Sequence, residues 1–386
     1  MNRPLQVGLV AGEASGDLLG AALIKALREK VPEVRFTGLT GGHMRAAGCE
    51  SLGDCSELAV MGLVEPLRHL PRLLGLRARL RREFLARRID LFVGVDAPAF
   101  NLGLARALRR RGVITAQYVS PQVWAWRPGR VPKIAASVDA VLCLLPFEPQ
   151  CYTGQPVRAQ FVGHPLADQI PLEPQRVAAR QRLGLQPSDL VVAILPGSRM
   201  GEVQRLGADF AAATVQLRQL LPQPLHFVAP MASARVAAVF EAQIRGAGAE
   251  IRLLEQGADD ALAAADVALV ASGTATLQAL LHGCPMVVAY RLAALTAFLV
   301  RDLRLVKLRH FSLPNLLAGE SLVPELFQEA VTPVALAEAL RRVLADQRAM
   351  APLRQRFHDI HRALRCDSAA RAAATLVDLL PAPALS

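Results

Sequence analysis

The sequence lacks the signatures of secreted, membrane-spanning and repeat proteins. Its six cysteines are scattered and include no Cys-x-x-Cys pair, so we expect neither a disulfide framework nor a zinc site in a reducing cytoplasm. No uninterrupted apolar run is long enough to cross a bilayer, and the first run, residues 6–11, is too short for a signal peptide. No repeat with a period of about 20–50 residues occurs. Any contact with a membrane is therefore expected at its surface.

Lysine is also scarce, because the 386 residues include 4 lysines but 40 arginines. With 33 acidic residues the formal net charge is +11, which is typical of nucleic-acid-binding proteins. The charge of a whole chain does not say where that charge lies, however. Since 52% of the residues are hydrophobic and 20% are charged, a disordered chain is excluded. The length predicts two domains, each large enough to bury its own core.

Short runs rich in Val, Ile and Leu alternate with longer segments rich in Ala, Leu and Arg. Nearly continuous apolar runs are typical of parallel strands that are buried on both faces. We expect strands at residues 6–11, 34–39, 91–95, 114–118, 140–144, 159–161, 190–195, 225–228, 251–254, 267–271 and 286–290. This βαβ alternation occurs twice, so it predicts an α/β fold with two Rossmann-like, doubly wound domains that face each other across a cleft.

Prolines at positions 165, 171, 174 and 187 indicate a linker between the two domains. The predicted domains are residues 1–168 and residues 169–330. Residues 331–386 show no strand pattern and are predicted to form two or three helices. These helices could pack within one chain or exchange between two copies.

Two loops that follow predicted strands of the first domain are candidates for function. Residues 12–17 (Gly-Glu-Ala-Ser-Gly-Asp) open a helix whose free N–H groups could bind an anion, although a tight turn capped by Ser15 or Asp17 explains them at least as well. They match neither the dinucleotide-binding nor the P-loop pattern. Asp96 lies just beyond a predicted strand, where it could act as a general base or simply form a turn before Pro98.

Two similar loops occur in the second domain. The run Leu-Pro-Gly-Ser-Arg at residues 195–199 can present backbone N–H groups, and its Arg199 can clamp a phosphate or be a solvated surface residue. The run Ala-Ser-Gly-Thr at residues 271–274 can bind phosphate at a helix start or merely cap that helix. Gln278 follows Thr274 by about one helical turn and could reach a sugar hydroxyl.

Other residue types with chemical potential are less specific. Both tryptophans, Trp124 and Trp126, lie beside Arg127, where they could stack on a sugar or pack a loop. Asn315 follows a proline and could bind a ligand or form a turn. The lone histidines at positions 43, 164 and 282 have no metal-ligand spacing, so we interpret them as structural.

Most of the net charge lies in one segment. Between Arg68 and Arg111, twelve arginines and three acidic residues give a net charge of +9 in 44 residues. Leucines recur there at helical spacing, and Pro71 is expected to break or start a helix. This pattern indicates a helix that lies on anionic lipid, although an amphipathic helix packed on its own sheet is the commoner arrangement. The residues of this predicted docking surface are Leu67, Leu70, Leu74, Arg77 and Arg81.

Taken together, these motifs resemble the lipid-A-disaccharide synthase family, in the family's order and across nearly the whole chain. The matching runs are residues 9–17, 57–62, 93–98, 118–121, 123–127, 195–199, 271–274 and 312–318. The resemblance implies a GT-B glycosyltransferase whose C-terminal helices pack back on the N-terminal domain. It also implies transfer of 2,3-diacylglucosamine from its UDP conjugate to 2,3-diacylglucosamine 1-phosphate, which gives UDP and a β-1,6-linked disaccharide.

The resemblance further implies roles for single residues. Asp96 becomes the candidate base for the 6-hydroxyl of the acceptor. Contacts to the UDP-sugar are implied for Gly197, Ser198, Arg199, Ser272, Gly273, Thr274, Gln278 and Asn315, and a cleft loop for Gly12, Glu13, Ser15 and Gly16. Two positions depart from the family. It usually has Glu where Gln278 stands and often Asp where Ala99 stands, so Asp96 is the only carboxylate of its motif.

The resemblance implies neither a metal nor another cofactor, in keeping with the lack of an Asp-x-Asp pair. The implied partners are a UDP-activated acylated sugar, an acylated sugar phosphate and the anionic surface of the inner membrane, which a cytoplasmic protein would bind peripherally. A homodimer is compatible with this picture, and nucleic acid is not expected.

Two alternatives stay open. One is another UDP-sugar enzyme of this fold, such as an N-acetylglucosaminyltransferase or a 2-epimerase. The other is a basic nucleic-acid-binding or membrane-binding module, against which the lack of an RNA motif argues.

Overall fold

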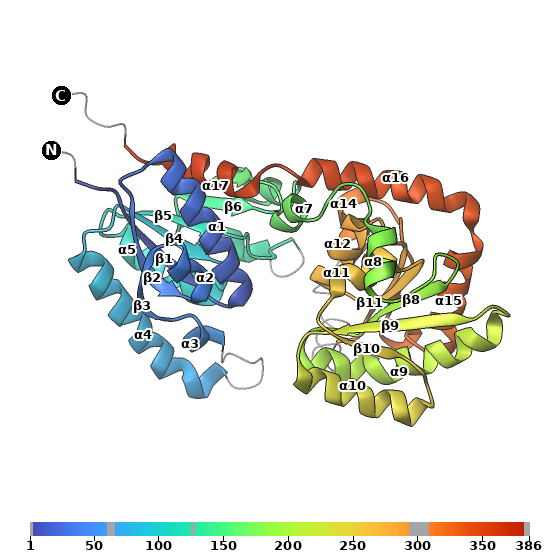
Figure 1. The fold of residues 1–386 in the computed structure, drawn as a ribbon. Coiled ribbons are helices and arrows are strands. Elements are labelled where there is room, and N and C mark those ends of the chain that lie inside the picture. Colours follow the sequence, from blue (N-terminus) through green and yellow to red (C-terminus); the bar gives the residue numbers. More distant parts are fainter. Residues whose placement is uncertain (1–2, 60–65, 125–127, 293–308, 382–386) are drawn as a thin grey trace. The chain divides into compact units, whose positions relative to one another are not determined.

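The computed structural model describes residues 3–59, 66–124, 128–292 and 309–381. The chain divides into two compact units, each built around one parallel sheet (Figure 1). The first unit consists of Met1–Asp168 with Leu364–Ser386, and the second of Gln169–Ala363.

The first unit contains a seven-stranded sheet with the order β3-β2-β1-β4-β5-β6-β7. Its strands are β1 (Gln6–Ala11), β2 (Arg35–Thr40), β3 (Cys49–Asp54), β4 (Leu91–Val95), β5 (Ile114–Tyr118), β6 (Ala140–Cys143) and β7 (Arg158–Phe161). Its helices are α1 (Ala14–Lys30), α2 (Gly42–Ala46), α3 (Ser56–Ala59), α4 (Pro66–Ala86), α5 (Pro98–Arg109), α6 (Val131–Ala135), α7 (Pro165–Gln169) and α17 (Ser368–Val377). The strand order reverses between β1 and β4.

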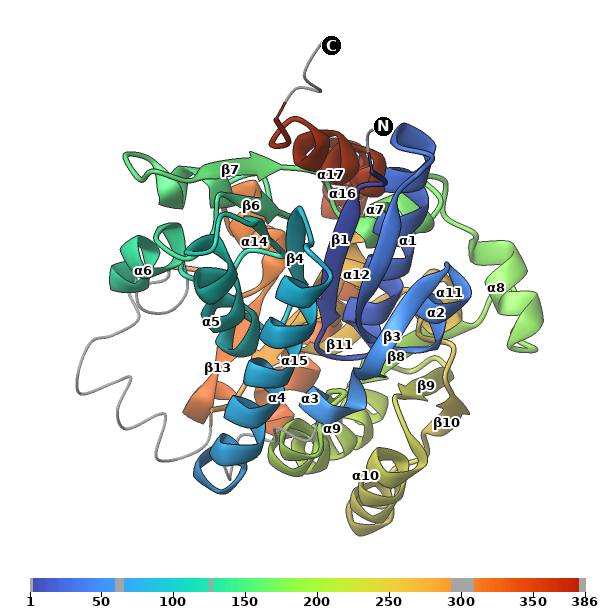
Figure 2. The same cartoon turned by 90° about the vertical axis from the view of Figure 1, so that its left-hand side faces the viewer.

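Successive residues of these strands face two different hydrophobic cores. Leu9 and Val93 pack in a core shared with α1, α2 and α17. Val10 and Phe92 point the opposite way, into a core shared with α4 and α5. The latter two helices lie side by side on their face of the sheet (Figure 2). Burial on both faces explains why these strands are apolar at every position.

The second unit contains a six-stranded sheet with the order β10-β9-β8-β11-β12-β13, which reverses between β8 and β11. Its strands are β8 (Leu190–Leu195), β9 (Leu225–Met231), β10 (Arg252–Glu255), β11 (Val267–Ala271), β12 (Met286–Tyr290) and β13 (Glu325–Phe327). Its helices are α8 (Arg176–Arg182), α9 (Met200–Leu220), α10 (Ala234–Ala247), α11 (Ala258–Ala264), α12 (Thr274–Leu281), α14 (Leu313–Ala318), α15 (Pro333–Ala345) and α16 (Gln347–Leu364). One face of this sheet packs with α9, α10 and α15.

The prediction of two doubly wound parallel sheets is confirmed, and every predicted strand is present. The edge strands β3 and β13 were not predicted. The C-terminal helices divide, because α15 belongs to the second unit whereas α17 packs on α1 of the first. No helix in the described ranges is long and apolar enough to cross a membrane.

The prediction that Pro71 breaks or starts a helix is wrong, because α4 begins at Pro66 and continues through it. Pro71 lies in the second turn of this helix, so only one intrahelical hydrogen bond, to the carbonyl four residues earlier, is lost. The helix continues because its later turns bury Leu73, Leu76 and Leu80 in the core.

Candidate functional site

Four of the predicted loops lie at the point in each sheet where the strand order reverses. In open α/β sheets, ligands bind outside the carboxyl ends of the strands at this point, because the adjoining loops leave in opposite directions. In the first unit residues 12–16, which comprise the turn after β1 and the start of α1, follow β1, and Asp96 follows the neighbouring β4. In the second unit the loop at residues 196–199 follows β8, and Ser272–Thr274 follow the neighbouring β11.

Three hydrogen bonds hold the backbone of Asp96, and none of the described residues bonds its carboxylate. Asp96 has a left-handed conformation with a φ of 53°, which is uncommon outside glycine. Its N–H donates to the carbonyl of Tyr118 at 2.9 Å, and its own carbonyl accepts from Asn101 at 2.8 Å and Gln117 at 2.9 Å. Its partly exposed carboxylate has no hydrogen-bond partner among the residues described. The carboxylate is therefore available to a ligand at this edge.

The loop after β1 packs directly on the loop that carries Asp96. A methyl group on Gly12 would come within 2.3 Å of the Cβ of Ala97, so only glycine fits this contact. Glu13 and Ser15 expose their side chains, whereas Gly16 is buried. This arrangement leaves two exposed polar side chains and the start of α1 at the edge.

The interpretation of Ser15 or Asp17 as a cap of α1 is wrong. The residue that precedes α1 is Glu13, and α1 has no side-chain cap. The buried carboxylate of Asp17 instead accepts N–H groups of Gly41 and His43, both at 2.8 Å, at the start of α2. The sequence predicted a cap for α1, but the carboxylate of Asp17 bonds the N–H groups at the start of α2 instead.

In the loop after β8, a carboxylate already occupies the backbone N–H groups. Glu202 Oε2 accepts from the N–H of Ser198 at 3.0 Å and of Arg199 at 3.3 Å, as a residue at this position of a capping box does. Gly197 has a φ of 130° and leaves room for Glu202. The N–H of Ser198 is therefore not free, and the exposed group is the Arg199 guanidinium, whose side chain is 72% exposed.

The loop after β11 is tied to a later segment of the chain. The hydroxyl of Ser272 donates to the carbonyl of Phe311 at 3.1 Å. Gly273 and Thr274 are exposed at the start of α12, where the first N–H groups of a helix have no intrahelical partner. Asn315 is buried, and its amide bonds the backbone of Leu322 and Val323 at 2.8–2.9 Å. Asn315 thus supports a loop and does not expose its amide.

Gln278 is part of a cluster that sequence reasoning missed. Its amide donates to Asp259 Oδ1 at 2.7 Å, and His282 Nε2 lies 2.8 Å from the same oxygen. Hydrogen bonding, first from His282 and then from Gln278, holds the pKa of the Asp259 carboxyl below its ordinary value. The four-residue spacing of Gln278, on α12, and His282, the residue directly after it, was the available signal, because it places both side chains on the same side of the helix.

A second missed carboxylate, Glu148, holds the tryptophan loop of the first unit. Glu148 is buried and accepts from the backbone N–H groups of Leu144 and Leu145 at 3.0 Å and from Trp124 Nε1 at 3.3 Å. Burial raises the pKa of Glu148 to about 7. Trp126 and Arg127 lie outside the described residues.

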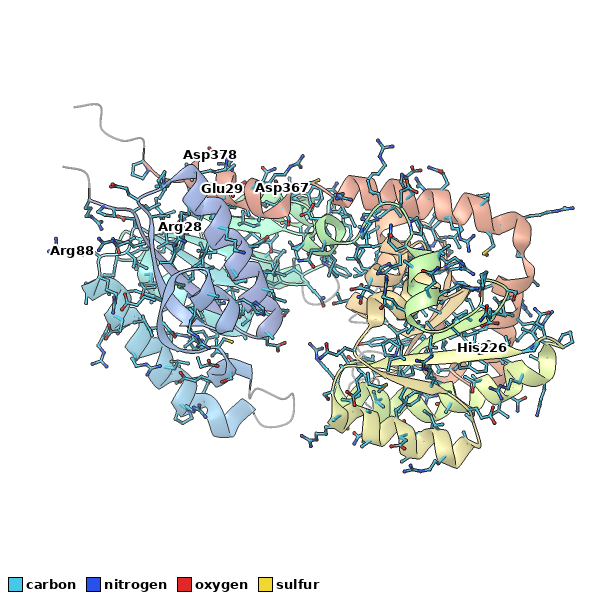
Figure 3. The ribbon with its side chains drawn as sticks, viewed as in Figure 1. Arg28, Glu29, Arg88, His226, Asp367 and Asp378 are labelled. Atoms are coloured by element: carbon cyan, nitrogen blue, oxygen red, sulfur yellow. The ribbon has the colours of Figure 1, made fainter. Side chains whose placement is uncertain are left out.

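The predicted docking surface is only partly exposed. Leu70 and Leu74 are 47% and 50% exposed, and Arg81 is exposed as well. Arg88, just beyond the end of α4, also points away from the ribbon (Figure 3). The side chain of Leu67 lies outside the described residues.

Arg77 departs from the expected surface position. Its guanidinium lies 5.1 Å from the ring centre of Phe100 and donates to the carbonyl of Ala99 at 3.2 Å. Burial lowers the pKa of this guanidinium. Arg77 turns inward because α5 offers it an aromatic face and a carbonyl, so it braces the first turn of α5.

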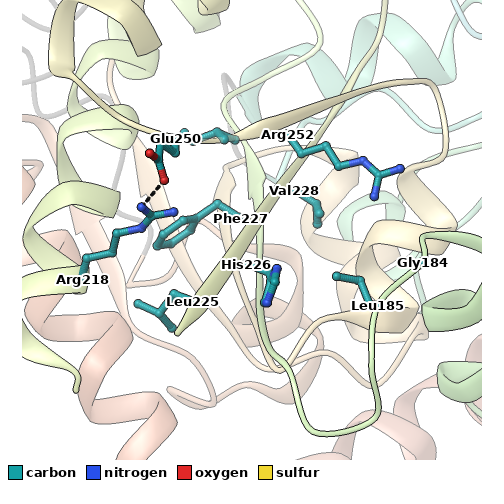
Figure 4. A pocket seen from close by; sticks show the side chains of 10 residues that line it. Gly184, Leu185, Arg218, Leu225, His226, Phe227, Val228, Glu250 and Arg252 are labelled. Carbon is teal, nitrogen blue, oxygen red and sulfur yellow. Dashed lines mark hydrogen bonds and ion pairs between the residues drawn. The ribbon is translucent and has the colours of Figure 1, made fainter. Parts of the chain in front are cut away.

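A separate open pocket of about 440 Å³ lies at the amino ends of β9 and β10 (Figure 4). Arg218 there pairs with Glu250 and stacks on Phe227. Because the pocket is at the edge opposite the carboxyl ends of these strands, it is not part of the candidate site. No three His, Cys, Asp or Glu side chains of the described ranges come together as metal ligands would.

Comparison with known proteins gives one consistent result. A family model described as lipid-A-disaccharide synthetase matches residues 7–376. A lipid-A-disaccharide synthase of Xanthomonas campestris pv. campestris (strain 8004) is 49% identical over 381 residues, which is 98% of this chain and 87% of that protein. One from Pectobacterium carotovorum subsp. carotovorum (strain PC1) is 47% identical over 382 residues, which is 98% of this chain and 99% of that protein.

Solved structures agree at the level of the fold. MurG of Acinetobacter baumannii matches with a TM-score of 0.61 at 12% identity, over 97% of this chain and 100% of that one. Anabaena HepE in complex with UDP and glucose matches with a TM-score of 0.58 at 13% identity, over the same shares. At such identities the likeness shows the fold alone, and the GT-B fold that we predicted is confirmed.

Proposed function

Because this chain belongs to the lipid-A-disaccharide synthetase family and is a glycosyltransferase, we propose that it transfers 2,3-diacylglucosamine from UDP-2,3-diacylglucosamine to 2,3-diacylglucosamine 1-phosphate. The products are UDP and the β-1,6-linked disaccharide 1-phosphate, formed with inversion at C1. The observation that supports this reaction most directly is the free carboxylate of Asp96 on a fixed backbone beside the reversal of the first sheet.

Asp96 acts as the general base in this proposal. Its carboxylate takes the proton of the acceptor 6-hydroxyl, and that oxygen uses its electron pair to form the bond to C1 of the donor. The bond between C1 and the diphosphate oxygen breaks on the opposite side, and UDP leaves with the electron pair. A positioned base contributes about 10²–10⁴ in rate.

The second unit binds the UDP part of the donor. The exposed guanidinium of Arg199 and the N–H groups of Gly273 and Thr274, which have no partner within α12, offset the negative charge that develops on the diphosphate. Gly197 and Glu202 shape the loop that presents Arg199. This division of roles needs no metal ion.

The substrates are anionic lipids, so the enzyme must meet them at a membrane. We place the contact at Leu70, Leu74 and Arg81, which α4 exposes on the first unit. Leucines that enter the headgroup region and arginines that pair with lipid phosphates are typical of interfacial helices. The protein would then work peripherally on the cytoplasmic leaflet of the inner membrane.

The proposal is tested by product analysis with both acylated substrates in detergent. We expect equal amounts of UDP and disaccharide, no UDP without acceptor, and unchanged turnover in the presence of a chelator. Asp96→Asn keeps a residue that tolerates the left-handed conformation, and it should lower kcat by at least about 10²-fold with little change in stability. The matched control is Asp378→Asn, which removes a carboxylate from the surface of the same unit (Figure 3).

Three results would overturn the proposal. Turnover of unacylated UDP-N-acetylglucosamine in place of the acylated donor would favour another UDP-sugar enzyme. Loss of activity with the chelator would contradict the metal-free site. Full activity of Asp96→Asn would remove this residue as the base.

A further inference from the structure

Asp259 is a carboxylate that two other side chains hold in place. Its Oδ1 accepts from Gln278 Nε2 at 2.7 Å and lies 2.8 Å from Nε2 of the buried His282. Both contacts converge on the same oxygen. Oδ2 has no partner among the residues that the structure describes, and the side chain is 65% exposed. The carboxylate therefore keeps one oxygen oriented toward solvent.

A surface ion pair between aspartate and histidine does not require the additional hydrogen bond that Gln278 donates to Asp259. A solvated carboxylate gains little from one partner, because both ions lose hydration and side-chain freedom. Here a neutral amide from the same helix face fixes the carboxylate as well, so its direction and not only its charge is specified. Such double support is typical of a side chain that has to meet a ligand in one orientation.

The position of the cluster indicates which ligand this is. Gln278 follows Thr274 by four residues on α12, which is about 6 Å along the helix axis. Thr274 begins α12 beside the reversal of the second sheet, where the diphosphate is placed above. A group about one helical turn from the diphosphate lies at the distance of the ribose in a nucleoside diphosphate. The vicinal hydroxyls of ribose are donors, and a carboxylate oxygen is the acceptor that suits them.

We propose that Asp259 accepts hydrogen bonds from the ribose hydroxyls of the nucleoside diphosphate, with Gln278 and His282 as its positioning residues. The inference rests on the proposed binding of a UDP-sugar to the second unit. Gln278 itself then does not need a charge, because the adjoining helix α11 supplies the carboxylate. This makes Asp259 a specificity-determining residue for ribose over deoxyribose nucleotides.

The test is the binding of UDP and of 2′,3′-dideoxy-UDP to the full chain, measured by calorimetry. The wild type should bind UDP roughly tenfold more tightly, because a hydrogen bond to a charged group is lost with the dideoxy ligand. In Asp259→Asn this ratio should fall to about 2 or less. Gln278→Met should lower the ratio in part, because the carboxylate then loses one of its two supports.

Asp260→Asn is the matched control. This neighbouring aspartate turns toward Arg182, with 2.6 Å between the charged groups, and should leave the tenfold ratio unchanged. An equal affinity of the wild type for both ligands would overturn the role of Asp259 and leave UDP binding intact. A tenfold preference for UDP that persists in Asp259→Asn would also overturn the role of Asp259. Binding of neither ligand by the wild type would overturn the proposed function together with this inference.

Discussion

The side-chain amide of Asn101 donates a hydrogen bond of 2.8 Å to the backbone carbonyl of Asp96. Asn101 is fully buried near the start of α5, and the same amide nitrogen lies 3.3 Å and 3.5 Å from the carbonyls of Val10 and Val95. One side chain therefore joins the ends of β1 and β4 at the reversal of the sheet. It fixes the backbone that carries the candidate base.

We expect Asn101→Ala to weaken both the fold and the catalysis. The substitution leaves buried carbonyls without a donor and opens a small cavity, so the free energy of unfolding should fall by about 2–4 kcal/mol. The value of kcat should fall at least about tenfold, because Asp96 is no longer held. Urea unfolding and steady-state kinetics measure the two effects. Arg106→Ala on the exposed side of α5 is the control, and equal behaviour of the two variants would contradict this account.

Gly12 and Ala97 should show strong coupling in a double-mutant cycle. The new methyl group of Gly12→Ala would come within 2.3 Å of the Cβ of Ala97, so we expect a loss of about 1–3 kcal/mol in unfolding free energy. Ala97→Gly removes that Cβ from a left-handed residue with a φ of 41° and should cost little. Since the next atoms of residue 97 lie 3.5 Å away, the double variant should recover most of the lost stability. Additive effects in thermal unfolding would show that this contact is not the cause.

The strands were predictable from the sequence where they are buried on both faces, because burial requires consecutive apolar residues. Strands such as β4 and β11 are apolar at each position, so their bounds follow from the sequence alone. The edge strand β3 has two exposed and three partly exposed residues among its six, and β13 has only three residues. Neither has enough consecutive apolar residues to be distinguished from a loop. The helix break predicted at Pro71 does not occur, because the packing of later turns of α4 outweighs the loss of one hydrogen bond.

The sequence predicted where the site residues lie in the fold, but not which residues their side chains contact. Loops after β1, β4, β8 and β11 were found because turn residues follow apolar strands. The destination of each side chain depends on neighbours that are remote in sequence, as Arg77 against Phe100 and Asn315 against Val323 illustrate. Asp259 was missed because nothing within its own segment distinguishes it from a solvated aspartate.

Exposed leucines and arginines of α4 should set the affinity for anionic membranes. Leu70→Ser with Leu74→Ser removes apolar surface, and Arg81→Glu with Arg82→Glu reverses two exposed charges. Each basic residue near an anionic surface contributes about 1 kcal/mol, so the charge reversal should weaken binding to phosphatidylglycerol vesicles at least about tenfold. Sedimentation with vesicles measures this binding, and the effect should shrink as salt increases.

The control for that experiment carries the same change of charge elsewhere. Arg235→Glu with Arg348→Glu alters two exposed arginines of the second unit. Vesicle binding should then stay within about twofold of the wild type. Equal loss in both charge-reversed variants would mean that total charge, and not α4, directs the membrane contact.

Glu148 should make the stability of the first unit depend on pH. Its carboxyl has a pKa of about 7 in the folded state, because burial penalises the charged form, against an ordinary value of 4.5. The folded state therefore holds this proton more tightly than the unfolded state. The resulting stabilisation is fully present below about pH 4.5 and is lost as the pH rises through about 7, with a total of about 3 kcal/mol.

Comparison with Glu148→Gln isolates this effect, because glutamine stays neutral and other titrating groups cancel in the difference. The variant should gain stability relative to the wild type between pH 5 and pH 8, whatever constant offset the altered contact with Trp124 adds. Trp124 should report the same step, since its Nε1 donates to Glu148 at 3.3 Å, so tryptophan fluorescence of the wild type should change with a midpoint near pH 7 and that of the variant should not. A difference in unfolding free energy that stays constant from pH 5 to pH 8 would mean that Glu148 is ionised throughout. The three N–H groups that face it would then outweigh the cost of its burial.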